Sequence, residues 1–225
     1  TTIIIVSEGS KLKIDKTAIV SDASAKLIQQ NNMLKIGLTG GIGSGKTTVA
    51  TIFNSFGIPI YNSDVRAKYI MNSNIELIDS IKKLLGEESY IDGQLNRSYI
   101  SKKVFTTPSL LQQLNKLVHP KVAKDFNEWC SKYSDEPFII KEAAILIESK
   151  AHLSLDKVIV VNAPTDIRIQ RVLKRDNSNL DAVKARINNQ ITEEERNKYS
   201  DFVINNDGEA SLILQVKKII KELIG

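Results

Sequence analysis

The stretch GGIGSGKTT, residues 40–48, constrains this chain more than any other part of its sequence. It matches the pattern G-x-x-x-x-G-K-[ST] of a phosphate-binding loop. The apolar run 34–40 precedes it, and apolar residues at helical spacing follow it as far as Gly57. The sequence therefore predicts a buried strand, a loop with few side chains and a helix in succession.

Such a loop has a defined chemistry. To wrap a polyphosphate it must aim consecutive backbone N–H groups inward, which requires positive φ angles and little side-chain bulk. The helix that follows adds the positive end of its dipole. Lys46 is then expected to reach the β- and γ-phosphates, and the hydroxyl of Thr47 to ligate Mg²⁺. A purine nucleoside triphosphate is the expected ligand.

Further apolar runs alternate with helical patterns. Four more runs have the length and content of buried strands: 58–61, 138–143, 157–162 and 201–205. This alternation is typical of a mostly parallel sheet covered on both faces. Residues 64–133, between the second and third strands, are almost wholly helical in pattern and too long for a simple crossover, so we expect an inserted helical subdomain there.

The composition narrows the class of protein. The chain has 225 residues, of which 42% are hydrophobic and 25% charged, as in ordinary globular proteins. It contains no run of 18 or more apolar residues, and its opening lacks the basic flank of a signal peptide, so we expect a cytoplasmic protein with no membrane partner. Cys130 is the single cysteine, which excludes an intrachain disulfide. Aromatic residues are not interleaved with basic clusters, so no nucleic-acid partner is expected.

Other motifs decide between the classes of phosphate-loop protein. A regulatory GTPase needs a D-x-x-G segment and an N-K-x-D motif, and neither occurs, because NKYS at 197–200 ends in serine. The L-S-G-G-Q signature of transporter ATPases is also absent. A small kinase remains, and it requires an acid that orients the attacking hydroxyl and arginines that close over the phosphoryl group.

Two acids and a group of arginines are candidates for these roles. Asp64 follows the second strand at the end where such sheets bind ligands, although it could equally be an N-cap or first-turn residue. Glu142 ends the third strand and is a candidate for the outer shell of the metal. Three arginines recur at helical spacing in RIQRVLKRD, residues 168–176, and a fourth stands on the next helical segment: Arg168, Arg171, Arg175 and Arg186. For each single arginine, a solvated surface position is as good an interpretation.

Several segments together resemble the dephospho-CoA kinase family. They are LTGGIGSGKTTV, NSDVRAK, LVHPKV, IQRVLKRD, ARINNQ and SDFVINNDG, in the order and spacing of that family, and the match runs from Met33 to Gly225. His119-Pro120 and Arg175-Asp176 make the resemblance specific. It implies a P-loop NTPase-type α/β fold with a parallel five-stranded sheet flanked by helices, a helical CoA-binding insertion and a helical lid.

The resemblance implies transfer of the ATP γ-phosphoryl group to the ribose 3′-hydroxyl of dephospho-CoA, with Mg²⁺. It divides the chain into four parts. An extension of unknown role comprises residues 1–32, and the nucleotide-binding core comprises 33–63, 134–165 and 200–225. The substrate-binding insertion comprises 64–133, and the lid comprises 166–199.

The resemblance also implies roles for individual residues. The implied catalytic residues are Lys46, Asp64 and Arg175. The implied ATP-binding residues are Gly41, Gly43, Ser44, Gly45, Lys46, Thr47, Thr48, Arg171, Arg175 and Asn206. The implied substrate-binding residues are Asp64, Arg97 and His119, and the implied metal ligands are Thr47 and Glu142.

Three features depart from the family pattern. Asn62 stands where the family usually has an aspartate, Glu142-Ala143-Ala144 replaces the usual D-V-P, and residues 1–32 have no counterpart. Two other functions stay open: a kinase for another small molecule, and a nucleotide-binding switch without turnover. The length of the helical insertion argues against the first, and the intact Lys46, Thr47 and Asp64 argue against the second. We expect a monomer.

Overall fold

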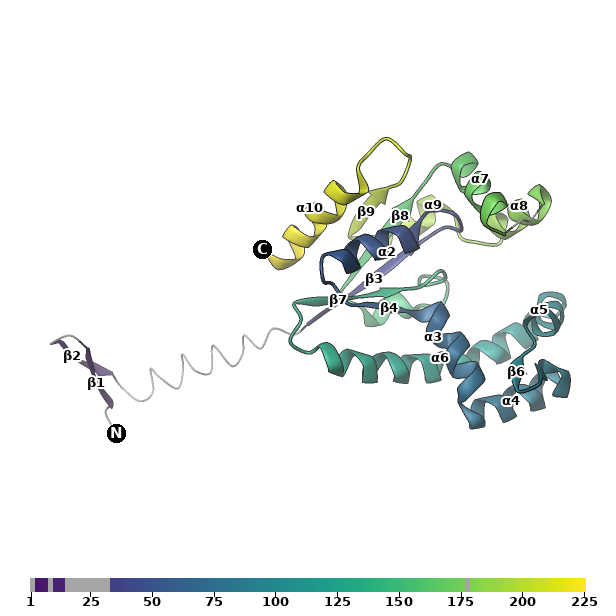
Figure 1. Ribbon diagram of the computed structural model, residues 1–225, viewed down its shortest axis with the longest axis horizontal. Coiled ribbons are helices and arrows are strands. Elements are labelled where there is room, and N and C mark those ends of the chain that lie inside the picture. Colours follow the sequence, from purple (N-terminus) through teal and green to yellow (C-terminus); the bar gives the residue numbers. More distant parts are fainter. Residues whose placement is uncertain (1–2, 8–9, 15–32, 177–178) are drawn as a thin grey trace.

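The protein is built on a parallel β-sheet, which Figure 1 shows at the centre of a computed structural model that describes residues 3–7, 10–14, 33–176 and 179–225. In this part of the chain the sheet has five strands in the order β4-β7-β3-β8-β9, and every adjacent pair is parallel. The strands are β3 (Leu34–Gly40), β4 (Ile60–Asn62), β7 (Phe138–Glu142), β8 (Lys157–Asn162) and β9 (Phe202–Asn205). The predicted fold class is confirmed.

Helices cover both faces of the sheet, which explains why its inner strands are apolar throughout. On one face lie α2 (Lys46–Ser55) and α10 (Leu212–Ile224), whose apolar sides pack on alternate residues of the strands. On the other face lie the C-terminal half of α6 (Pro108–Cys130), the segment 143–155 and the short α9 (Glu193–Asn197). Because the strands are parallel, their carboxyl ends lie at one edge of the sheet, which is the edge where sheets of this kind bind ligands.

The residues between β4 and β7 form a helical unit with a hydrophobic core of its own. Its helices are α3 (Ser63–Ser73), α4 (Ile75–Leu85), α5 (Arg97–Thr106) and α6, and a two-stranded hairpin lies between α4 and α5, formed by β5 (Tyr90–Ile91) and β6 (Gln94–Leu95). Buried residues of this core include Leu77, Ile81 and Leu85, spaced along one face of α4. Figure 1 shows this unit beside the sheet, attached to it through α3 and α6.

Two further helices follow β8. They are α7 (Thr165–Asp176) and α8 (Leu180–Asn188). The carbonyl of Pro164 accepts the first helical hydrogen bond of α7, from the Arg168 N–H at 3.0 Å, so the proline stands directly before this helix. The side chain of Thr192 caps α9 by accepting a hydrogen bond from the Glu195 N–H at 3.1 Å.

Two sequence-based expectations need correction or fall outside this description. The second strand was expected at 58–61 but begins at Ile60, because Pro59 has no N–H to donate to a neighbouring strand. The insertion was expected to be almost wholly helical, and besides its helices it contains only the short β5–β6 hairpin among its described strands. Of residues 1–32 the structure describes only an antiparallel pair, β1 (Ile3–Ser7) and β2 (Ser10–Ile14), and the rest of that predicted extension lies outside the described residues.

Within the described ranges, none of the helices combines the length and the apolar character that crossing a membrane would require.

Candidate functional site

The glycine-rich loop joins β3 to α2 and has the backbone that a phosphate cradle requires. Gly43 and Gly45 have φ angles of 78° and 93°, in the left-handed region that side chains disfavour. A Cβ on Gly45 would lie 2.1 Å from Nδ2 of Asn206, and one on Gly43 would lie 2.5 Å from the carbonyl oxygen of Arg168. Glycine is therefore required at both positions by conformation and by space.

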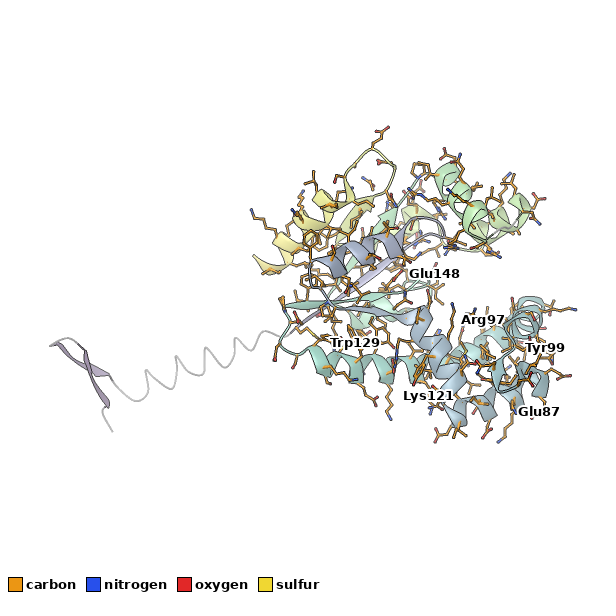
Figure 2. All side chains as sticks on the ribbon, viewed as in Figure 1. Glu87, Arg97, Tyr99, Lys121, Trp129 and Glu148 are labelled. Carbon is orange, nitrogen blue, oxygen red and sulfur yellow. The ribbon has the colours of Figure 1, made fainter. Side chains whose placement is uncertain are left out.

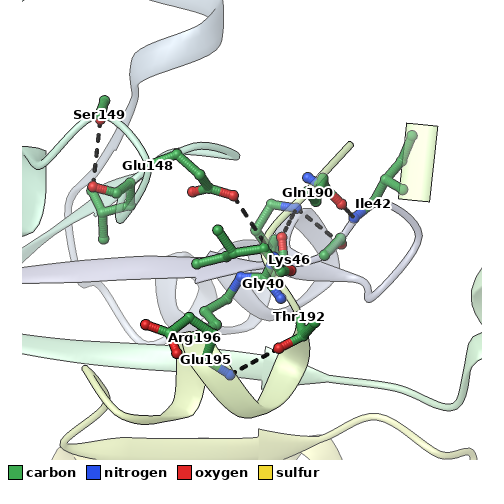
Figure 3. Close-up of polar contacts among 12 residues, drawn as sticks. Gly40, Ile42, Lys46, Glu148, Ser149, Gln190, Thr192, Glu195 and Arg196 are labelled. Atoms are coloured by element: carbon green, nitrogen blue, oxygen red, sulfur yellow. Dashed lines mark hydrogen bonds and ion pairs between the residues drawn. The ribbon is translucent and has the colours of Figure 1, made fainter. Parts of the chain in front are cut away.

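Lys46 folds back over this loop. Its ammonium group donates to the carbonyl of Gly40 at 2.8 Å and to that of Gly41 at 3.3 Å, as Figure 3 shows for Gly40. Burial lowers the pKa of Lys46 to about 8, against the opposing effects of Glu142 and Asp64. The lysine thus lies at the loop, under the electrostatic influence of two carboxylates, Glu142 at the end of β7 and Asp64 in the first turn of α3.

Glu142 links the loop to the neighbouring strand. One of its carboxylate oxygens accepts from the Thr47 hydroxyl at 2.9 Å, and the other accepts from Nδ2 of Asn62 at 2.8 Å. A hydroxyl and a carboxylate in contact form a donor set of hard oxygens, which suits Mg²⁺. The residues present therefore fit the predicted metal. Thr48 is exposed on the first turn of α2.

Two of the predicted arginines hold the loop from α7. Arg168 is buried, and its Nε donates to the carbonyl of Ile42 at 2.9 Å. Arg171 lies next to the carbonyls of Gly43 and Ser44, each at 3.4 Å from Nη1, and its Nη2 donates to Oδ1 of Asn206 at 3.1 Å. The structure thus brings both arginines to the loop that the sequence predicts as the phosphate site.

The other two arginines lie elsewhere. Arg175 and Arg186 both pair with Asp176, with nitrogen-to-oxygen distances of 2.7 and 2.8 Å, and both are exposed. The two guanidinium groups lower the pKa of Asp176 below its ordinary value. Of the three arginines of α7, Arg186 therefore meets Arg175 and not Arg168 or Arg171, because α8 carries it to the outer end of α7.

A cavity of about 390 Å³ lies between α3, α6 and the segment 143–154. Asp64, in the first turn of α3, lines it, and His119 lines it from the middle of α6. Asn62 is the N-cap of α3, accepting from the Val65 N–H at 2.9 Å, so Asp64 itself is not the cap. Asp64 therefore stands between this cavity and Lys46.

Asn206 and Arg97 are the last two of the predicted site residues. Asn206 is buried and donates from Nδ2 to the carbonyl of Ser44 at 2.7 Å. It also lines a cavity of about 440 Å³ at the carboxyl ends of β8 and β9, walled by residues such as Pro164 and Glu194. Arg97 opens α5 on the surface of the helical unit and does not line the cavity of Asp64 and His119 (Figure 2).

The chain was compared with known protein families. A family model described as dephospho-CoA kinase matches residues 34–211. The chain belongs to this family.

Named members of the dephospho-CoA kinase family are similar along most of their length. The dephospho-CoA kinase of Bacteroides fragilis is 36% identical over 187 residues, which cover 83% of this chain and 91% of that protein. That of Porphyromonas gingivalis is 37% identical over 190 residues, covering 84% and 94%.

Two solved structures show the same fold. A crystal structure of a Thermus thermophilus protein is 31% identical, has a TM-score of 0.78, and is matched over 86% of this chain and 100% of its own. The dephospho-CoA kinase from Campylobacter jejuni is 28% identical, with a TM-score of 0.63, covering 84% and 96%.

Three side chains near the site were not predicted from the sequence. Oε1 of Gln190 accepts from the Ile42 N–H at 2.7 Å, and the buried Arg196 lies 3.9 Å from Glu148 beside Lys46 (Figure 3). Lys141, buried in β7, lines the cavity of Asp64 and His119. The available signal was a lysine within the apolar run FIIKEA, where alternation places it on one face of the sheet.

Proposed function

We propose that this chain is a dephospho-CoA kinase, which transfers the γ-phosphoryl group of ATP to the ribose 3′-hydroxyl of dephospho-CoA and so forms coenzyme A. The observation that carries the proposal is the place of Asp64. Its carboxylate lines the cavity beside the helical unit and also acts electrostatically on Lys46 at the phosphate loop. One acid between two binding sites is what phosphoryl transfer between two substrates requires.

In this proposal the phosphate loop holds ATP and the cavity of Asp64 and His119 holds dephospho-CoA. The phosphates lie against the loop of residues 43–48 and the ammonium of Lys46, and the adenine occupies the cavity lined by Asn206. Arg171 contributes positive charge from α7. Arg175 reaches the phosphates only after it leaves Asp176, so its role belongs to a closed form of the lid.

The chemical step is an in-line displacement. The 3′-oxygen of the acceptor forms a bond to the γ-phosphorus as the bond from that phosphorus to the β,γ-bridging oxygen breaks, and ADP leaves. Asp64 accepts or orients the proton of the attacking hydroxyl. Mg²⁺, bound near Thr47 and Glu142, supplies charge neutralisation on the phosphate oxygens when present. Lys46 and Arg171 stabilise the same charge.

The test is ADP formation from ATP and Mg²⁺ with dephospho-CoA, beside adenosine, AMP and pantetheine as alternative acceptors. We expect turnover with dephospho-CoA alone and coenzyme A as the product. Turnover with another acceptor in its place would identify a different small-molecule kinase. ATP binding without turnover with any acceptor would identify a nucleotide-binding switch.

A further inference from the structure

Lys141 lies in an environment that is unusual for a lysine. It is the fourth residue of β7, in the interior of the sheet, and only 6% of its surface is exposed. Lysine is almost never buried to this extent unless its charge is paired. Yet the Lys141 ammonium makes no hydrogen bond and no ion pair with the described residues, and its Nζ lies 4.3 Å from the ring centroid of Phe126.

The side chain of Lys141 points towards the proposed acceptor site. Alternation along β7 places Ile139 and Lys141 on one face, and Ile139 packs with Phe126 and Tyr61 on the α6 side of the sheet. From this face Lys141 reaches the 390 Å³ cavity that Asp64 and His119 also line. The pKa of His119 is lowered by partial burial and then by Lys141, in agreement with two basic groups that face the same space.

Enclosing an ammonium without an ion pair costs stability, and a ligand that supplies the opposite charge offsets that cost. Burial lowers the pKa of Lys141, because removing the ammonium from water disfavours its charged form. The cavity that it lines is otherwise largely apolar, with Met71, Leu114 and Val118 among its walls. The cavity therefore leaves the Lys141 ammonium room to pair with an anionic group of a molecule that fills it.

We infer that Lys141 binds the diphosphate of the acceptor substrate. This inference rests on the proposed function, because dephospho-CoA has the diphosphate as its only ionised group, joined to the 5′-carbon of the ribose whose 3′-hydroxyl reacts. A cation on one wall and Asp64 at the mouth then fix the two sides of one ribose. Lys141 acts in binding and specificity, and it takes no part in the transfer of the proton or the phosphoryl group.

The experiment compares the full-length chain with Lys141→Met, which keeps the length and apolar character of the side chain and removes its charge. We expect the Kd and KM for dephospho-CoA to rise on the order of ten- to a hundredfold, as for loss of a charge-assisted hydrogen bond. The KM for ATP stays unchanged. The matched control is Lys217→Met, which removes the same charge from the exposed face of α10 and leaves all three constants as in the unmodified protein.

Thermal unfolding separates binding from a structural role. Without ligand, Lys141→Met should unfold at the same temperature as the unmodified chain or a higher one, and the increase in Tm that dephospho-CoA produces should be largely lost. An unchanged Kd for dephospho-CoA, or a weakened Kd accompanied by a lower Tm without ligand, would overturn the inference. If the unmodified chain neither binds nor phosphorylates dephospho-CoA, the proposed function fails and this inference with it; if the unmodified chain does both, the Lys141 result stands alone.

Discussion

Among the individual residues, Lys46 has the charge that depends most clearly on pH. Its pKa of about 8 in the free protein means that it loses its proton in the range where enzymes are commonly assayed. ATP binds the charged form, so binding raises this pKa. Above pH 8 the Kd for ATP should therefore rise by up to about tenfold for each pH unit.

Titration of ATP into the protein between pH 7 and 10 measures this effect. The matched variant is Lys46→Arg, which stays charged over the whole range and should show a Kd that varies little with pH. A constant Kd for the unmodified protein up to pH 10 would mean that Lys46 keeps its proton in the free state.

Asp64 permits a second prediction at this scale. Asp64→Asn keeps the size of the side chain but removes its capacity to accept the hydroxyl proton, so kcat should fall on the order of a hundredfold or more. The Kd for ATP should change little, since no hydrogen bond joins Asp64 to the described residues of the loop. Steady-state kinetics beside Asp79→Asn, an exposed acid of α4, provide the comparison. Near-full turnover of Asp64→Asn would exclude the role of base.

At the scale of elements, the junction of β4 and α3 shows how an amide replaces an acid. Asn62 accepts from the Val65 N–H as the cap of α3 and donates to Glu142. Asn62→Asp keeps the cap but sets two carboxylates within hydrogen-bonding distance. Their repulsion raises the pKa of the pair in the folded state, so the folded protein holds a proton that the unfolded chain has released, and the penalty grows as pH rises.

We expect Asn62→Asp to lower the Tm at pH 8, by an amount that corresponds to about 1–3 kcal/mol, and to have a smaller effect at pH 5. Mg²⁺ should restore part of the loss at pH 8. Asn62→Ser also caps α3 and adds no charge, so its effect should be the same at both pH values. Equal losses for Asn62→Asp at pH 5 and pH 8 would contradict the proximity of the two carboxylates.

Elements also show which parts of the structure the sequence predicts. The loop and the helix after it are local features, and Lys46 begins α2 as expected. Strand β8 agrees at both ends, because its apolar run is continuous and buried. The contacts of Gln190 and Arg196 depend on how the segment after α8 folds back over the phosphate loop. No local sequence pattern predicts this contact between segments that are far apart in the chain. Lys141 was missed because strand alternation assigns it to a face of the sheet but does not reveal which side chains and which cavity lie on that face.

At the scale of the whole molecule, separate hydrophobic clusters lie beneath the proposed ATP site and within the helical unit beside the proposed acceptor site. The buried residues of the helical unit, such as Leu77 and Ile81, pack among themselves, whereas Ile36 and Ile159 belong to the core beneath α2. Ile81→Ala should cost about 2–5 kcal/mol in the free energy of unfolding, as large-to-small changes at fully buried sites do. Because its cluster lies away from the phosphate loop, the Kd for ATP should hold while the KM for dephospho-CoA rises.

Denaturant unfolding and separate titrations of the two substrates test this division. Ile36→Ala, in the strand that carries the loop, is the comparison and should weaken ATP binding as well. If Ile81→Ala impaired ATP and dephospho-CoA equally, the two cores would have to be regarded as a single cooperative unit.

The direction of β3 has a practical consequence. The strand enters the sheet at Leu34 and delivers its last residue, Gly40, to the phosphate loop, six residues and about 20 Å further on. The C-terminus lies at the same end of the sheet as Leu34, since α10 runs back from β9 (Figure 1). An affinity tag, a surface tether or a fused partner enzyme joined directly before Leu34 or after Gly225 is thus attached at the end of the sheet away from the phosphate loop. Immobilised in that orientation, the protein presents the proposed ATP and acceptor sites to the solution.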